Sequence, residues 1–123
     1  MAVETLDHFT INTTDLPRSV AFYTDVLGLR DGDRPAFDFP GAWLYCGARP
    51  VVHLVGREGP AETGTGTLDH VAFRANDVQT YRERLRQRSA EFTERDVPGM
   101  PLHQIFLEDP DGVTIELNFW EEA

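Results

Sequence analysis

The sequence predicts an α+β protein made of two copies of a βαβββ module, and three observations lead to this fold class. The hexapeptide from Leu6 to Ile11 (LDHFTI) recurs as the hexapeptide from Leu68 to Phe73 (LDHVAF), a shift of 62 residues (70 − 8). Asp15 and Asp77 are related by the same shift, and each precedes a helix-like segment. Short strand-like segments separated by turn residues then follow each helix. The chain is therefore predicted to repeat one unit of about sixty residues.

The first module begins with residues 3–12, whose alternating pattern predicts a strand. Asp15 is a plausible N-cap, Pro17 suits the first helical turn, and Gly28 is a natural stop for the helix that follows. Gly and Pro residues then separate three short predicted strands, which lie around residues 29–33, 42–46 and 51–55.

The second module repeats this plan with a strand over 68–75, a helix over about 78–89, and strands near 91–96, 103–108 and 113–119. Asp109-Pro110-Asp111-Gly112 separates the last two strands and is a strong turn signal, so its role is predicted to be structural. Between the modules, Gly56–Thr67 contains four Gly and one Pro and has the composition of a linker. We therefore expect one domain with module one at 1–56, a linker at 57–67 and module two at 68–123.

Composition excludes several functional classes. The chain of 123 residues is 41% hydrophobic and 26% charged, which is typical of a folded globular protein. Its formal net charge of −10 repels phosphate backbones and anionic membrane surfaces, so no nucleic-acid or membrane partner is expected. The single Cys46 fits a reducing compartment, and the N-terminus has no secretory pattern. These features predict a cytoplasmic protein.

The repeat also points to candidate metal ligands among histidine and glutamate side chains, none of which would suggest a metal site by itself. His8 and His70 occupy the same position in the two modules. His53 and Glu116 lie in the last strands of their modules, 63 residues apart (116 − 53), so they are equivalent with one residue of slippage. A lone histidine is more often structural than a ligand, but two metal-capable side chains at matching places in each module favour a metal site.

Strand periodicity supports this interpretation at Glu116. Its carboxylate lies between Ile115 and Leu117 in a predicted strand, and a buried unpaired carboxylate is costly. An ion pair with Arg74, which shares the ligand face of its own strand, is one way to compensate the charge. A divalent cation bound together with imidazoles is the interpretation we favour.

These motifs together resemble the vicinal oxygen chelate superfamily, which includes glyoxalase I, extradiol dioxygenases and bleomycin-resistance proteins. The resembling segments are LDHFTI and LDHVAF, the helix start Asp15–Ser19, Phe22–Leu29, and Phe106–Leu117. The resemblance implies paired βαβββ modules that form a cup-shaped mixed sheet around a divalent metal, with His8, His53, His70 and Glu116 as ligands. Such a nitrogen-rich set suits Fe, Mn, Ni, Zn or Co rather than Ca or Mg.

The resemblance also implies a class of reaction. Four protein ligands leave two positions of an octahedral ion for a small substrate with vicinal oxygens, which favours a lyase or isomerase working through a metal-stabilised enolate. His53 stands where glyoxalase I-like enzymes usually carry a carboxylate or Gln, so Glu116 would also act as the catalytic base. Two alternatives stay open: an extradiol-type Fe(II) dioxygenase acting on a catechol-like substrate, and a non-enzymatic drug-sequestering protein of the bleomycin-resistance kind.

Further residues are assigned by strand parity. Arg74, Gln104 and Phe106 are expected to contact the substrate, whereas His103 is expected at the rim. Trp43 and Tyr45 alternate with Leu44 and are expected to pack on the helix side or at a subunit contact. Many members of the superfamily are dimers, so a homodimer is expected, with the ligands drawn from one chain or from two.

Overall fold

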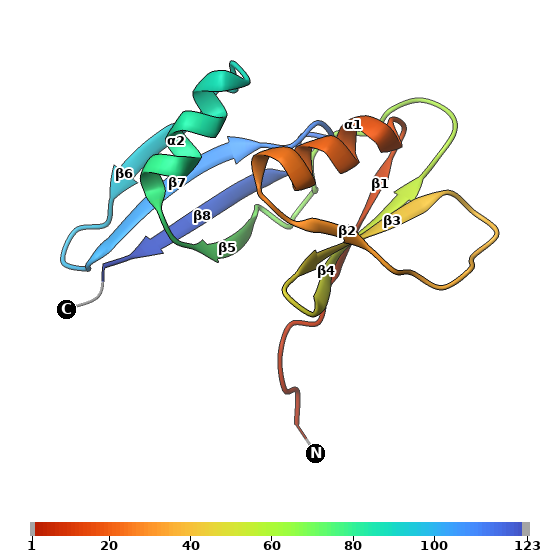
Figure 1. Ribbon diagram of the computed structural model, residues 1–123, viewed down its shortest axis with the longest axis horizontal. Coiled ribbons are helices and arrows are strands. Elements are labelled where there is room, and N and C mark those ends of the chain that lie inside the picture. Colours follow the sequence, from red (N-terminus) through yellow and green to blue (C-terminus); the bar gives the residue numbers. More distant parts are fainter. Residues whose placement is uncertain (1, 122–123) are drawn as a thin grey trace. The chain divides into compact units, whose positions relative to one another are not determined.

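The computed structural model describes residues 2–121. The chain divides into two compact units, with the boundary between Ala61 and Glu62, a position inside the predicted linker. Each unit consists of one four-stranded mixed sheet and one helical segment, in the order βαβββ (Figure 1). This confirms the predicted α+β fold class with two repeated modules.

The first unit contains β1 (Phe9–Thr13), α1 (Leu16–Ala21), β2 (Arg30–Gly32), β3 (Gly41–Cys46) and β4 (Arg49–Gly56). A π-helical turn, η1 (Phe22–Val26), continues α1. The strand order is β1-β4-β3-β2, with β1 parallel to β4 and the other pairs antiparallel. The central strand β4 therefore has β1 on one side and β3 on the other.

The second unit contains β5 (Val71–Ala75), α2 (Val78–Gln87), β6 (Thr93–Asp96), β7 (Leu102–Glu108) and β8 (Thr114–Trp120). Its strand order is β5-β8-β7-β6, and β5 is parallel to β8. Strand β8 thus takes the place in this unit that β4 takes in the first. No helix within residues 2–121 is long and apolar enough to cross a membrane.

Local sequence signals account for the ends of the helices and for the tightest turn. As N-caps do, the Asp15 carboxylate accepts the backbone N–H of Arg18, and the Asp77 carboxylate accepts that of Thr80. Gly28 has a φ of 81°, which ends the first helical segment at a residue without a side chain. Asp109 Oδ1 accepts two backbone N–H groups of its own turn, so the predicted structural role of this aspartate is confirmed.

Each sheet has one apolar face, which packs against the helical segment of its own unit. In the second unit Leu85 of α2 is buried, and Tyr81 of the same helix meets Phe119 edge-on. The buried side chains of both units come from alternate strand positions and include Ala42, Leu44, Val52, Leu54, Ile105, Leu107, Ile115 and Leu117. The opposite face of each sheet carries the candidate site residues.

The expected starts of two strands and the helix-side placement of Trp43 were wrong. β1 begins at Phe9 and β5 at Val71, whereas strands were expected from residues 3 and 68. Pairing of β1 with β4 starts at Phe9↔Val52, just past Pro50, whose ring nitrogen has no hydrogen to donate. Of the two places expected for Trp43, the helix side is wrong: Trp43 lies opposite His53, because β3 turns Ala42 and Leu44 toward the apolar core instead. A subunit contact stays a prediction.

Candidate metal centre

In the second unit the parallel pair β5–β8 brings His70 beside Glu116. The register pairs Ala72 with Glu116, and His70 stands just before β5 on the same face. His70 Nε2 lies 3.5 Å from Glu116 Oε1, and Glu116 is only 8% exposed. Two ligands about 2.1 Å from one tetrahedral or octahedral ion are about 3.0–3.4 Å apart, so this separation is close to that of neighbouring ligands.

Each repeated histidine is held by the aspartate that precedes it. His8 Nδ1 is 2.6 Å from Asp7 Oδ2, and His70 Nδ1 is 2.8 Å from Asp69 Oδ2. The hydrogen bond from His8 lowers the pKa of Asp7, so this carboxylate is ionised and can only accept. Nδ1 of His8 is therefore the donor in this pair, and Nε2 is the ring nitrogen left to face an ion, as in metal-binding histidines whose other nitrogen is held by a carboxylate.

In the first unit the predicted ligands His8 and His53 also meet. Thr10 pairs with His53 in the parallel β1–β4 register, and His8 precedes β1 just as His70 precedes β5. The two imidazole rings stack at 3.7 Å with an interplanar angle of 12°, and Trp43 stacks on His53 at 4.1 Å. His53 is thus held between a histidine and a tryptophan.

The surroundings of His53 favour its neutral form. Burial, followed by the charge of His8, lowers the pKa of His53 below its ordinary value. The carbonyl of Pro50 lies 3.0 Å from His53 Nε2 and can only accept, so Nε2 donates and Nδ1 retains the lone pair. Because the two stacked rings are nearly parallel, their in-plane lone pairs do not converge, and one ring must leave the stack for both to bind one ion.

The residues present fit a divalent transition metal by their donor chemistry. The three histidines offer imidazole nitrogens, with His53 held in its neutral form, and Glu116 offers one buried carboxylate. This set favours Mn, Fe, Co, Ni or Zn. The structure presents them as two pairs, one in each unit. Within each unit, among residues 2–121, no three His, Cys, Asp or Glu side chains form a group that could hold an ion alone.

Sequence reasoning missed two features around these pairs. Trp43 covers one face of the His53 ring. This contact follows from the antiparallel register of β3 with β4, which the sequence alone does not reveal. Asn118 Nδ2 donates to Glu116 Oε2 at 2.8 Å, and Asn118 is the side chain that follows Glu116 on the same face of β8. The sequence did carry a signal for Asn118, because residues two apart in a strand lie on the same face.

The residues expected to contact a substrate lie on the sheet face that carries Glu116. Arg74 is exposed, and its guanidinium lies 5.7 Å from the ring centre of Trp120 rather than against Glu116. The ring of Phe106 lies under the guanidinium of Arg95, and Gln104 is buried at 6% exposure. The face therefore offers two exposed cations, Arg74 and Arg95, and the aromatic ring of Phe106, which pairs with Glu116.

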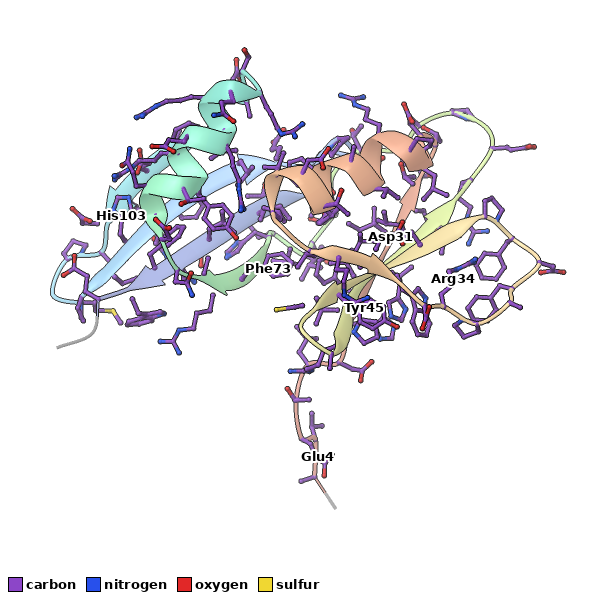
Figure 2. All side chains as sticks on the ribbon, in the orientation of Figure 1. Glu4, Asp31, Arg34, Tyr45, Phe73 and His103 are labelled. Atoms are coloured by element: carbon purple, nitrogen blue, oxygen red, sulfur yellow. The ribbon has the colours of Figure 1, made fainter. Side chains whose placement is uncertain are left out.

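His103 lies apart from these groups, on the side of the sheet that α2 covers (Figure 2). Its Nδ1 is 2.7 Å from Asp96 Oδ1 and its Nε2 is 2.7 Å from Glu94 Oε1. These hydrogen bonds to Asp96 and Glu94 raise the pKa of His103. Arg82 of α2 contacts the same Glu94 oxygen, so the cluster joins a helix to two strands.

Comparison with known proteins settles the family. The model of the Glyoxalase/Bleomycin resistance protein/Dioxygenase superfamily matches residues 5–117. The chain belongs to this superfamily. The resemblance inferred from the repeated segments is thereby confirmed, and the match includes all four candidate ligands.

Individual superfamily members agree with this assignment. The lactoylglutathione lyase of Salmonella typhimurium is 33% identical, over 89% of this chain and 88% of that protein. The glyoxylase/bleomycin resistance protein/dioxygenase domain from Frankia sp. EAN1pec superposes with a TM-score of 0.82 at 21% identity, covering 99% and 96% of the two chains. A variant of the fosfomycin resistance protein FosX from Listeria monocytogenes, solved with Mn(II) and a dihydroxypropylphosphonic acid, gives 0.76 at 19% identity, covering 98% and 95%. These relatives support an enzyme of the glyoxalase type that acts on a small molecule.

Proposed function

We propose that this superfamily member is a divalent-metal-dependent lyase or isomerase of the glyoxalase type, acting on a small substrate with oxygens on neighbouring carbons. Its metal ligands are His8, His53, His70 and Glu116. The observation that carries the proposal is an arrangement found twice. In each unit a histidine just before the parallel edge strand lies beside a ligand-type side chain of the central strand.

The proposed roles follow from the surroundings of each side chain. When bound, the ion supplies Lewis-acid polarisation of two neighbouring substrate oxygens. Asp7 and Asp69 hold His8 and His70 with Nε2 available. Glu116 is the only carboxylate among the ligands, and it takes up the proton that leaves the substrate carbon.

The same sheet face supplies the proposed substrate contacts. The exposed guanidinium of Arg74 binds an anionic group of the substrate, and the ring of Phe106 packs against its apolar part. Gln104 shares this face, but both ends of its amide are engaged by neighbouring side chains. We therefore place Gln104 behind the surface that the substrate touches.

Metal content is the first test. We expect about one equivalent of Mn, Fe, Co, Ni or Zn per chain, lost alike in His53→Ala and in Glu116→Ala because both pairs serve one ion. His103→Gln is the matched control, since it removes an imidazole outside the site, and it should keep its metal. A wild-type protein that takes up none of these ions would contradict the proposal and favour the sequestering alternative. Two equivalents, with each variant losing one, would show separate sites.

Activity is the second test. Given the lactoylglutathione lyase relatives, methylglyoxal mixed with glutathione is the first substrate to supply, and formation of the S-lactoylglutathione thioester is the reaction to follow by its ultraviolet absorbance. Glu116→Gln keeps the side-chain shape but removes the base, so kcat should fall by about 10²-fold or more. Turnover of a catechol with Fe(II) and consumption of O₂, without thioester formation, would instead support the extradiol alternative.

Mixing the His53→Ala and Glu116→Ala variants tests whether the ligands of one site come from two chains. Only a site shared between two chains would regain activity in the mixture, because one of its two copies would then hold all four ligands.

A further inference from the structure

A line of three hydrogen bonds runs across the second sheet and ends on the candidate ligand Glu116. Arg95 Nε donates to Gln104 Oε1 at 2.8 Å, Gln104 Nε2 donates to Asn118 Oδ1 at 3.0 Å, and Asn118 Nδ2 donates to Glu116 Oε2 at 2.8 Å. The strand register supports this line, since Arg95 pairs with Gln104 and Gln104 pairs with Asn118. We call Arg95, Gln104 and Asn118 the relay.

The two ends of the relay determine the orientation of both amides. A guanidinium can only donate, so the oxygen of Gln104 must face Arg95 and its NH₂ must face Asn118. A carboxylate can only accept, so the NH₂ of Asn118 must face Glu116. All three bonds therefore point the same way, from a permanent cation to an anion, and bonds aligned in this manner polarise and strengthen one another.

The first unit provides an internal comparison. Trp43 pairs with His53 as Phe106 pairs with Glu116, so Gly41 and Val55 occupy the places of Gln104 and Asn118. Neither residue has a polar side chain, and His53 is held instead by ring stacking and the Pro50 carbonyl. The relay thus accompanies the carboxylate ligand and has no counterpart beside the imidazole ligand.

We propose that Arg95, Gln104 and Asn118 are positioning residues for Glu116, an inference that rests on the proposed function. Asn118 occupies Oε2, which leaves Oε1 directed toward His70 as the atom that meets the ion. Gln104 fixes the amide of Asn118, and Arg95 fixes Gln104 while supplying the balancing positive charge. Partners behind a ligand are known to orient it and to raise metal affinity.

The test measures Co²⁺ binding to metal-free protein by competition with a chromophoric chelator, together with the visible absorption spectrum of the Co²⁺ complex. Asn118→Leu should weaken Co²⁺ binding by about 10–100-fold and shift the spectrum, because the carboxylate is no longer held in one orientation. Gln104→Met should act in the same direction with a smaller effect. Arg86→Met is the matched control for Arg95→Met, since Arg86 is exposed on α2.

Two further variants separate a relay from simple satisfaction of buried polar groups. Gln104→Glu keeps the acceptor for Arg95 but loses the donor to Asn118, so it should weaken Co²⁺ binding by more than its loss of folded protein accounts for. Arg95→Met should weaken binding in the wild type and have no further effect in Asn118→Leu, because the line is already broken there.

Each outcome decides between the proposals. If wild-type protein binds Co²⁺ and every relay variant binds within twofold of it, or if the Arg95 and Asn118 effects simply multiply, the relay proposal is wrong and the proposed function stands. If the wild-type protein binds none of Mn, Fe, Co, Ni and Zn, both proposals fail. If it binds one of the others but not Co²⁺, the same competition is run with that ion and the same outcomes decide. Thermal unfolding of each variant shows whether a loss of binding reflects a loss of folded protein.

Discussion

His53 shows how one side chain can combine structural and chemical roles. Its ring packs between His8 and Trp43, while burial and the charge of His8 lower its pKa. A neutral imidazole near pH 7 is ready to bind a metal without first losing a proton. The aromatic sandwich therefore buries the ring and favours its neutral form, and one of the two histidine rings leaves the stack when both bind one ion.

The stacking of Trp43 on His53 predicts a fluorescence response to metal. The protein contains two Trp, so Trp120→Phe leaves Trp43 as the single reporter. Co²⁺ or Ni²⁺ held by His53 should quench this emission by half or more, because the indole ring centre is 4.1 Å from the imidazole ring centre. His53→Ala in the same background should abolish the response at equal metal concentration. Quenching that survives this substitution would place the ion elsewhere.

At the scale of elements, the His103 cluster ties α2 to the edge of the second sheet. His103 of β7 is bonded to Asp96 and Glu94 of β6, and Glu94 also accepts from Arg82 of α2. Both nitrogens of His103 face carboxylates, so the protonated ring satisfies both. Burial opposes this protonation, but the hydrogen bonds and charges of Asp96 and Glu94 outweigh it and the pKa of His103 is raised.

This raised pKa predicts a stability that depends on pH. A group whose pKa is higher in the folded state stabilises the fold fully below its unfolded pKa of 6.5 and loses this contribution as the pH rises through the folded value. The difference in unfolding free energy between wild type and His103→Gln should therefore shrink from pH 5.5 to 8.5, by on the order of 1 kcal/mol. Urea unfolding at several pH values measures it. A difference that does not change with pH would contradict the assignment.

At the scale of the whole molecule, the repeat makes a prediction about the two cores. Leu44 pairs with Val52 and Leu107 with Ile115, a shift of 63 (115 − 52), so the two leucines occupy equivalent places. Both are buried, at 0% and 5% exposure. Leu44→Ala and Leu107→Ala should each lower the unfolding free energy by about 3 kcal/mol, because each leaves a cavity in its own unit.

Urea unfolding followed by circular dichroism measures these costs. Leu6→Ala is the matched control, since Leu6 is 76% exposed, and it should change the unfolding free energy by less than about 0.5 kcal/mol. If either Leu44→Ala or Leu107→Ala lowered the unfolding free energy by less than Leu6→Ala does, the two units would not be equivalent in packing despite their common topology.

Much of the fold could be predicted from the sequence, because its signals are local. The caps at Asp15 and Asp77, the stop at Gly28 and the turn at Asp109 act within a few residues along the chain. Strand alternation likewise placed Glu116 on the opposite face of its strand from Ile115 and Leu117. These signals predicted two βαβββ modules and the matching positions of the four candidate ligands.

The rest depended on contacts between residues far apart in the chain. The parallel registers of β1 with β4 and β5 with β8 set His8 beside His53 and His70 beside Glu116, and no local pattern specifies such a register. The same holds for the relay, since Arg95, Gln104 and Asn118 come from three strands. The sequence by itself determined which residues repeat and on which face of a strand each one lies. The tertiary structure alone decided which of them touch, because strand pairing is a non-local choice made by the packing of each whole sheet.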